Sequence, residues 1–352
     1  MTPLSDIIDK VRQNQRMDAK EAGILLAEAD LLTLGSLAHS RRFFLHPDPV
    51  VTYVIDRNIN YTNTCVSGCR FCAFFRPPGH GDGYVISFED LAGKIQETLD
   101  LGGTQILLQG GMNPDLDLDF YETMLRFIKQ RFDIHIHGFS PPEIHFMAQK
   151  FGLPVADVIA RLQAAGLDSI PGGGAEILCD EIRARVSPDK CTADAWLDVM
   201  RRAHQAGMRS SATMMFGHLE QAHHVIAHLE KIRQLQDETG GFTAFIPWTF
   251  QPANTRIQVE KKTAVTYLRV LALSRLFLDN VPNIQASWVT QGDKIAQTAL
   301  FFGANDMGST MIEENVVAAA GVEFMLPLAE LKRLIAKAGF TPCQRNCFYT
   351  LL

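Results

Sequence analysis

Asn60-Tyr-Thr-Asn-Thr-Cys65-Val-Ser-Gly-Cys69-Arg-Phe-Cys72-Ala-Phe74 is the stretch that decides the fold, because it holds three cysteines in the spacing C-x3-C-x2-C. A cubane 4Fe-4S cluster needs thiolate ligands from a compact loop. Three thiolates from one loop leave the fourth iron without a protein ligand, so a small molecule can chelate it. The spacing therefore predicts a 4Fe-4S cluster held by Cys65, Cys69 and Cys72.

Neither zinc nor a disulfide framework explains these cysteines as well. Structural zinc normally takes four protein ligands, often as two paired C-x2-C units. The next cysteine, Cys179, lies far along the chain, followed by Cys191, Cys343 and Cys347. Disulfide frameworks are typical of small secreted chains, whereas this chain has 7 cysteines, an odd number, in 352 residues.

The composition indicates an intracellular enzyme with a large core. Hydrophobic residues make up 47% and charged residues 20% of the chain, enough for one large domain or two ordinary ones. A formal net charge of -6 gives no basic footprint for nucleic acid. No apolar run is long enough to span a bilayer, and the N-terminus lacks an apolar signal core. We therefore expect a cytoplasmic protein that binds neither nucleic acid nor membrane.

Short β-branched runs alternate with amphipathic stretches, a pattern typical of parallel strands joined by crossover helices. About eight strands are expected, at residues 51–60, 104–109, 133–138, 167–170, 209–216, 242–248, 283–288 and near Ala304. Helices are expected at residues 87–101, 117–132, 155–165, 192–206, 220–238, 262–278 and 292–301. Glycines 102, 166, 207 and 240 fall where helices should stop. This order predicts an α/β fold of the (β/α)8 TIM-barrel type, closed or incompletely closed.

Two regions are expected along the chain. Residues 1–50 should form a helical leader across the bottom or side of the barrel. Residues 51–352 should form the barrel itself, with a C-terminal helix at 328–338 and a tail that closes it.

Chemistry in such barrels gathers at the C-terminal ends of the strands, and unusual residues follow two of the expected strands. After the second strand stand Gln109, Gly110 and Gly111, and adjacent glycines let the backbone approach a ligand closely. A simple turn would also explain two glycines. Trp248 and Trp288, near later strand ends, could wall an aromatic substrate, although core packing explains buried aromatics equally well.

Histidines form two groups that we interpret differently. His135 and His137 alternate on the third strand, and such residues serve as metal ligands, as an acid-base pair, or simply as inward hydrogen-bonding groups. His137, with Ser140, is the better candidate because both lie near the strand's end. The histidines at 223, 224 and 228 have helical spacing, and we expect a solvated helix face, since no carboxylate or cysteine completes a metal site.

A glycine run follows the fourth strand in Ser169-Ile-Pro-Gly172-Gly-Gly174-Ala-Glu176. Three successive glycines remove side chains, so that Glu176 can be presented to a polar ligand. An anion-binding nest is the alternative, but a carboxylate in the ligand zone opposes it. Glu176 is therefore a candidate either for binding a polar ligand or for the role of a base.

With these segments in place, the chain resembles the radical S-adenosylmethionine (SAM) superfamily. In that superfamily SAM chelates the open iron of the 4Fe-4S cluster, and an aromatic residue, here Phe71, usually precedes the last cysteine. The resemblance implies that Gln109, Gly110 and Gly111 stand for the segment that binds the amino group of SAM. Met112 replaces an acid that is often found there, so the contact would come from the backbone.

The resemblance extends to the later strands. Thr213-Met-Met215-Phe-Gly217 is close to the pattern Gly-x-Ile-x-Gly-x-x-Glu that lies against the adenine in such barrels. Thr replaces the first Gly and Met the Ile, and a polarizable Met can still pack on a purine. The resemblance implies that Met215 and Gly217 bind SAM, with Ser140 a further candidate, and that Glu176 binds its sulfonium or ribose or acts as a base.

Six segments narrow the resemblance to the radical SAM enzymes of futalosine-dependent menaquinone biosynthesis and deazaflavin cofactor synthesis. They are residues 65–76, 108–112, 139–144, 169–177, 212–218 and 286–292. The form Cys-Val-x-Gly-Cys-Arg-Phe-Cys and the strand Phe245-Ile-Pro-Trp-Thr-Phe250 favour the member that cyclises dehypoxanthine futalosine. Aminofutalosine synthase and the two deazaflavin components share most of these motifs and stay open as alternatives.

The resemblance implies a radical reaction on a small molecule. A reduced cluster would cleave SAM to a 5′-deoxyadenosyl radical, which takes hydrogen from the ribose 4′ carbon of dehypoxanthine futalosine. The carbon radical would add to the benzoate ring and lose an electron and a proton, with Glu176 or His137 as proton acceptor. Arg76 and Arg256 could pair with the substrate carboxylate.

Electrons would come from a donor such as flavodoxin or ferredoxin. A non-enzymatic iron-sulfur electron carrier is the alternative from another class. Such a carrier normally protects its cluster with a fourth cysteine, which the loop at residues 65–72 lacks.

Overall fold

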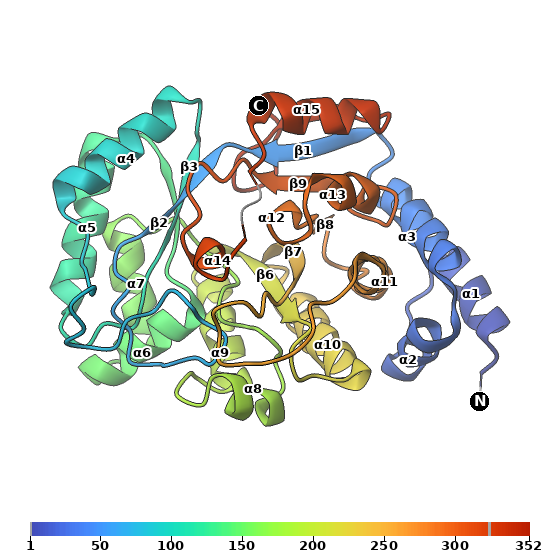
Figure 1. The fold of residues 1–352 in the computed structure, drawn as a ribbon, viewed down its shortest axis with the longest axis horizontal. Coiled ribbons are helices and arrows are strands. Elements are labelled where there is room, and N and C mark those ends of the chain that lie inside the picture. Colours follow the sequence, from blue (N-terminus) through green and yellow to red (C-terminus); the bar gives the residue numbers. More distant parts are fainter. Residues whose placement is uncertain (1, 323–324) are drawn as a thin grey trace.

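A curled parallel sheet forms the centre of the protein (Figure 1). The computed structural model describes residues 2–322 and 325–352. Each strand of this seven-stranded sheet pairs in parallel with the next one along the chain, so a crossover must return the chain between them. The strands are β2 (Asp56–Asn60), β3 (Gln105–Gln109), β4 (His135–Gly138), β5 (Ser169–Ile170), β6 (Arg209–Phe216), β7 (Phe242–Thr249) and β8 (Asn283–Ile284).

A second, three-stranded sheet continues the curve between the two edges of the first. Its order is β10 (Thr341–Gln344), β1 (Val50–Val54) and β9 (Asp306–Ser309). A bridge between Gln285 and Asp306 joins the end of β8 to β9, and the amide of Ile312 donates to the carbonyl of Asp56 in β2 over 3.2 Å. The prediction of an incompletely closed TIM-type barrel is confirmed. The strand expected at residues 51–60 is, however, two strands, β1 and β2, in different sheets.

Helices surround the sheet, and every helix expected from the sequence is present within a few residues of its expected bounds. Ser87 caps the first of them as predicted, with its hydroxyl accepting from the amide of Asp90 at 3.0 Å. The helices after β2 are α4 (Phe88–Asp100), α5 (Leu118–Arg131), α6 (Pro141–Phe151), α7 (Val155–Ala165), α8 (Asp180–Val186), α9 (Ala193–Gln205), α10 (Ala222–Thr239), α11 (Ala264–Phe277), α12 (Trp288–Gln291), α13 (Asp293–Ala299), α14 (Val316–Ala319) and α15 (Leu328–Lys337).

Helix α6 was missed in the sequence although its start carries clear signals. Pro141 and Pro142 occupy its first turn, where a missing amide proton costs nothing. Ser140 and Glu143 form a capping box around this turn. The strand expected at residues 283–288 is also shorter than predicted, because α12 begins at Trp288.

The leader is helical and packs against the side of the barrel. It comprises α1 (Leu4–Arg12), α2 (Ala19–Glu28) and α3 (Leu31–Leu45), which lie beside α10 and α11 (Figure 1). Two arginines tie it down through carbonyl oxygens: Arg233 donates to Met17 at 2.7 Å and Arg269 to Ala29 at 2.9 Å. None of the helices in the described ranges is long and apolar enough to cross a membrane.

Strand β3 shows how the barrel separates its core from its interior. Ile106 and Leu108 are fully buried in the apolar core, where each contributes about 1.5–3 kcal/mol of burial free energy. The alternate residues, Gln105, Leu107 and Gln109, line a cavity inside the barrel. Because strand side chains alternate in direction, this period of two places polar groups where a ligand can reach them.

Candidate active site

The cysteine loop follows β2, and its neighbours hold it through backbone hydrogen bonds. The amide of Cys65 donates to the carbonyl of Arg76 at 2.9 Å, and that of Arg70 to Val186 at 2.9 Å. Cys69 is buried and the other two cysteines are half-buried. All three thiols sit where burial raises their pKa and the nearby Lys190 ammonium lowers it.

Two backbone amides point at the first of these sulfurs. Ser67 and Met112 donate to Cys65 Sγ at 3.4 and 3.3 Å, and Ser67 Oγ lies 2.8 Å from Cys69 Sγ. Hydrogen bonds of this kind stabilise thiolates and tune an iron-sulfur centre.

Gly110 and Gly111 make close packing against the cysteine loop possible. A Cβ at Gly111 would lie 2.1 Å from the carbonyl oxygen of Thr64 and 2.8 Å from the Cβ of Cys65. A Cβ at Gly110 would lie 2.5 Å from the ring of Tyr61. The expected close backbone approach is therefore to the loop itself, and it brings the Met112 amide to Cys65.

Glu143 holds Gly110 in place through hydrogen bonds. Its contact with Ser140 also shows what Ser140 does in the fold. The buried carboxylate accepts from Tyr61 Oη at 2.6 Å, from the Gly110 amide at 3.0 Å and from Ser140 Oγ at 2.5 Å. Burial raises the pKa of Glu143, and the hydrogen bonds from Ser140 and Tyr61 oppose the rise. Ser140 is thus a helix cap that positions Gly110 through Glu143, and it does not line the central cavity.

Glu176 stands at the junction between the cavity and the cysteine loop. Its backbone has a positive φ of 42°, its Oε1 accepts from Lys190 Nζ at 2.9 Å, and its Oε2 lies 3.7 Å from Arg183 Nη1. Among the described residues, Glu176 Oε2 is buried without a hydrogen-bond partner. This unpaired oxygen is free to accept from a ligand.

Lys190 carries the positive charge of this junction and was missed in the sequence. Its ammonium lies 5.0 Å from the centre of the Phe71 ring, directly above the cysteine loop. Burial alone would lower the pKa of Lys190, but Cys69 and Glu176 raise it above its ordinary value. A lone lysine in a polar turn gives no sequence signal that it folds back onto a cysteine loop.

The three glycines before Glu176 are required by packing. A Cβ at Gly172 would lie 2.7 Å from the backbone of Ala212, one at Gly173 2.5 Å from Gln109 Nε2, and one at Gly174 2.3 Å from Pro142. The glycine run therefore seats the segment on β6 and α6, and this seating delivers Glu176 to the cavity.

Helix α10 supports the same segment from behind. His228 is fully buried, and its Nδ1 accepts from the amide of Leu178 at 3.0 Å. Burial lowers the pKa of His228 to about 3. His224 is also buried, so the expectation of a solvated histidine face was wrong for these two residues. His228 thereby supplies a partner for the Leu178 amide, whereas His224 Nδ1 accepts from the amide of Gln221 at 3.0 Å.

Met215 and Gly217 lie at the end of β6 beside Glu176. The amide of Met215 donates to the carbonyl of Glu176 at 3.0 Å, and the Met215 side chain is buried in the core. Gly217 has a φ of 97°, and its amide donates to Glu220 Oε1 at 2.6 Å. Neither residue lines the central cavity; Met215 fixes the backbone at Glu176, and Gly217 fixes the turn that follows β6.

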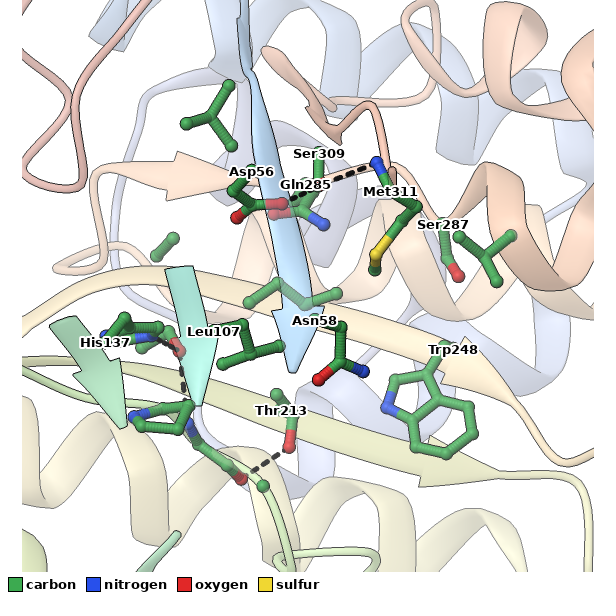
Figure 2. Close-up of a pocket in the computed structure, with 18 of the residues that line it drawn as sticks. Asp56, Asn58, Leu107, His137, Thr213, Trp248, Gln285, Ser287, Ser309 and Met311 are labelled. Atoms are coloured by element: carbon green, nitrogen blue, oxygen red, sulfur yellow. Dashed lines mark hydrogen bonds between the residues drawn. The ribbon is translucent and has the colours of Figure 1, made fainter. Parts of the chain in front are cut away.

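The central cavity has a volume of about 290 Å³ and fills the interior of the barrel. Figure 2 shows His137 and Trp248 on opposite sides of it, with Asn58 and Thr213 between them. Glu176 and Gln109 line it as well, so the structure brings these predicted residues together with His137. Both tryptophans expected at strand ends, Trp248 and Trp288, also belong to its wall.

Asp56 is a buried carboxylate of the cavity that sequence reasoning missed. It accepts from Gln105 Nε2 at 2.8 Å and from Ser309 Oγ. Burial raises the pKa of Asp56, against the hydrogen bonds from these two groups. The alternation of Asp56, Asn58 and Asn60 in β2 was the available signal, because residues two apart share one face of a strand.

The C-terminal tail closes the lower end of the cavity. Arg345 donates to both oxygens of Asp306 at 2.6 and 3.0 Å, and its guanidinium lies 3.8 Å from the Tyr349 ring centre. Arg345, Cys347 and Tyr349 all line the cavity. This buried ion pair holds the tail in place, and removing one partner of such a pair costs about 3–5 kcal/mol.

His137 faces the cavity from β4, as its position in the strand predicts. Its Nδ1 lies 2.6 Å from Ser169 Oγ and its Nε2 3.4 Å from Ser211 Oγ. Burial lowers the pKa of His137 to about 3, so the ring is neutral.

Arg76 and Arg256 lie elsewhere. They line a separate hollow beside Cys72 and are not part of the cavity wall.

Comparison with known proteins identifies the family. Residues 59–232 match the model of the radical SAM superfamily, and residues 239–352 match that of the CofH/MqnC C-terminal region. The chain is 46% identical over 351 residues to cyclic dehypoxanthine futalosine synthase of Halalkalibacterium halodurans, covering 99% of this chain and 95% of that protein. It is 42% identical to 5-amino-6-(D-ribitylamino)uracil--L-tyrosine 4-hydroxyphenyl transferase of Methanopyrus kandleri. This match covers 85% of this chain and 84% of that protein.

Solved structures show the same fold at low identity. The FeFe-hydrogenase maturase HydG from Carboxydothermus hydrogenoformans superposes with a TM-score of 0.78 at 18% identity, covering 98% of this chain and 80% of that one. Methylornithine synthase (PylB) superposes with a TM-score of 0.74 at 18% identity, covering 96% of this chain and 97% of that one.

A curled parallel barrel with a three-cysteine loop at its rim defines a radical SAM enzyme, which uses a 4Fe-4S cluster and SAM. The chain belongs to this superfamily, in the group that contains cyclic dehypoxanthine futalosine synthase and the 4-hydroxyphenyl transferase.

Proposed function

We propose that the protein converts dehypoxanthine futalosine to cyclic dehypoxanthine futalosine, a step of menaquinone biosynthesis. The observation that carries this proposal is the similarity, over nearly the whole chain, to two proteins of that name, at 46% and 42% identity. A cavity of about 290 Å³, lined in part by Trp248 and Trp288, suits a small substrate with an aromatic ring.

The residues around the cysteine loop fit a cluster and SAM. Cys65, Cys69 and Cys72 would hold the cluster, which supplies one electron for cleavage of the SAM sulfonium. Glu176 Oε2, buried and unpaired, would accept from the amino or ribose groups of SAM. The Lys190 ammonium would form an ion pair with the carboxylate of SAM.

The remaining predicted contacts surround this position. Phe71 and the backbone of Gln109, Gly110 and Gly111 would border the methionine end of SAM, and Met215 and Gly217 the adenine end. Ser140, which caps α6, would act through Glu143 and Gly110 and make no contact of its own.

The cavity determines what happens to the substrate after SAM cleavage. Its walls would hold the substrate so that the ribose 4′ radical meets the benzoate ring of the same molecule. The cyclised radical must then lose one electron and the proton of the attacked ring carbon. We assign the proton to His137, whose ring lines the cavity in neutral form, because Glu176 is already engaged by Lys190.

A transfer of the 4-hydroxyphenyl group of tyrosine is the second candidate function. It is favoured by the 42% identity to the Methanopyrus kandleri protein. Aminofutalosine synthase, in which the adenosyl radical adds to its substrate, is the other enzyme alternative.

One anaerobic assay separates these functions. We expect the reconstituted protein with SAM and dehypoxanthine futalosine to release 5′-deoxyadenosine together with a cyclised product two hydrogen atoms lighter than the substrate. Product from tyrosine and 5-amino-6-(D-ribitylamino)uracil would instead support the transferase. An adenosyl adduct would indicate addition, and spectra unchanged by SAM would indicate an electron carrier.

We further propose that an acidic electron donor, such as flavodoxin or ferredoxin, docks at the hollow beside Cys72. Arg76 and Arg256 border this hollow, and the Arg256 guanidinium lies exposed, 5.5 Å from the Phe75 ring centre. Cationic side chains next to a cluster ligand would attract an acidic partner to the position from which an electron travels least.

Arg256→Glu should therefore slow flavodoxin-dependent turnover roughly tenfold at low salt while leaving dithionite-dependent turnover unchanged. Arg12→Glu, on the exposed face of α1, is the matched control and should change neither rate. A raised KM for substrate with both reductants would show that Arg256 pairs with the substrate carboxylate instead.

A further inference from the structure

Ser169 joins three side chains below the cavity. Its hydroxyl lies 2.7 Å from His135 Nε2, 2.6 Å from His137 Nδ1 and 3.5 Å from Cys347 Sγ. The three side chains come from β4 and from the C-terminal tail, so only the folded barrel assembles them. The reaction proposed above uses His137 and leaves the other three groups without a role.

One assignment of protons satisfies all of these contacts. Burial raises the pKa of Cys347 to about 11, so the thiol keeps its proton and donates to Ser169 Oγ. His137 Nδ1–H donates to the second lone pair of that oxygen, and the hydroxyl proton points to His135 Nε2. This arrangement leaves His137 Nε2, the nitrogen nearest Ser211, as an acceptor on the cavity side.

The far end of the chain of contacts reaches the outside of the barrel. His135 is half-buried, and its ring stands edge-on to Phe348, which is 44% exposed. Beside it lies the ion pair of Lys129 and Asp168, whose side chains are each 31% exposed. His137, at the other end of these contacts, lines the central cavity.

Two histidines and a cysteine could also hold a metal ion, since their donor atoms lie within 4.8 Å of one another. The contacts favour hydrogen bonding. Ser169 Oγ stands at hydrogen-bond distance from both rings and the thiol, and it saturates them without an ion. The guanidinium of Arg345, two residues before Cys347, also opposes a further cation nearby.

We propose that His137, Ser169 and His135 form a proton relay from the substrate cavity to the underside of the barrel. This inference rests on the proposed cyclisation, in which a proton must leave the substrate. Neutral His137 cannot store the proton, because burial lowers its pKa to about 3. If the proton moves on to Ser169 and His135, His137 does not have to hold it.

The step balances as follows. The C–H bond at the attacked ring carbon breaks, and its proton passes to His137 Nε2. One electron would leave for a one-electron oxidant, such as an oxidised iron-sulfur centre, and the remaining electrons complete the aromatic ring. His137 Nδ1–H passes to Ser169, the Ser169 proton to His135 Nε2, and a proton leaves His135 at its other nitrogen.

His135→Gln tests the relay, because glutamine can still hydrogen-bond Ser169 but cannot pass a proton on. We expect single-turnover release of 5′-deoxyadenosine within about twofold of wild type, and formation of cyclised product slowed roughly 100-fold. Ser169→Ala should behave in the same way. Added imidazole should partly restore product formation by His135→Gln, since the outer end of the relay is open to solvent.

His204→Gln is the matched control. His204 is also held between two hydroxyls, Thr239 at 2.6 Å and Ser210 at 2.7 Å, but it does not line the cavity. The His204→Gln variant should give the same ratio of cyclised product to 5′-deoxyadenosine as wild-type protein.

Two results would overturn the relay. One is a product ratio in His135→Gln equal to that of His204→Gln, with no effect of imidazole. The other is one equivalent of zinc or extra iron, found by metal analysis of wild-type protein and lost in His135→Gln, which would make the site a metal centre. A different result would contradict the proposed function itself: wild-type protein would then release no 5′-deoxyadenosine with dehypoxanthine futalosine.

Discussion

Cys69→Ala should abolish SAM cleavage. The remaining two thiolates cannot hold a cubane that must also leave one iron open for SAM. Cys69 is the most deeply buried of the three cysteines assigned to the cluster. Iron and sulfide content and 5′-deoxyadenosine formation, measured after anaerobic reconstitution, should both fall to background.

Cys343→Ser is the matched control for this experiment. Cys343 lies on β10, paired through its backbone with Thr52 of β1, and it does not line the cavity. Its iron content and turnover should match wild type. Full activity of reconstituted Cys69→Ala, or an equal loss in both variants, would contradict the assignment of the cluster loop.

Glu176→Gln should have the second largest effect. The substitution keeps the size of the side chain but removes the charge that pairs with Lys190 and the second anionic oxygen that faces the ligand. A hydrogen bond to a charged group contributes about 1.5–3 kcal/mol, so SAM affinity should fall roughly 10- to 100-fold. Equilibrium binding of SAM and the rate of 5′-deoxyadenosine formation measure this loss together.

Glu122→Gln provides the comparison. Glu122 is also buried and ion-paired, with Arg161 at 2.5 Å and Arg126 at 2.6 Å, but it lies on α5 outside the barrel. The Glu122→Gln variant should have a lower free energy of unfolding and an unchanged affinity for SAM. If Glu176→Gln cleaves SAM normally but makes less cyclised product, Glu176 is the base, and wild-type values for both would leave it a structural role only.

Local patterns in the sequence were sufficient for the cluster loop and for most of the barrel. A loop of eight residues contains all three cysteines that we assign to the cluster, so their spacing depends little on distant parts of the chain. The helices were predicted because caps such as Ser87 and stop signals such as Gly240 are also local. The strand at residues 51–60 was predicted as one element because no glycine or proline separates Val54, the end of β1, from Asp56, the start of β2.

Groups that meet across the barrel could not be found in this way. Lys190 reaches Phe71 and Glu176 only because the segment between α8 and α9 folds over the cysteine loop. His228 looked solvated because its partner, the amide of Leu178, lies 50 residues earlier in the chain.

The sequence by itself therefore determined the cofactor chemistry, the barrel class and the positions of His137 and Glu176 at strand ends, since each depends on neighbours a few residues away. Only the tertiary structure decided that Ser140 is a cap, that Asp56 faces the cavity, and that Cys347 closes it beside Ser169. The physical reason is that hydrogen bonds and burial at these positions join residues from separate strands and from the tail. Their partners are chosen by the closure of the barrel, which no short segment encodes.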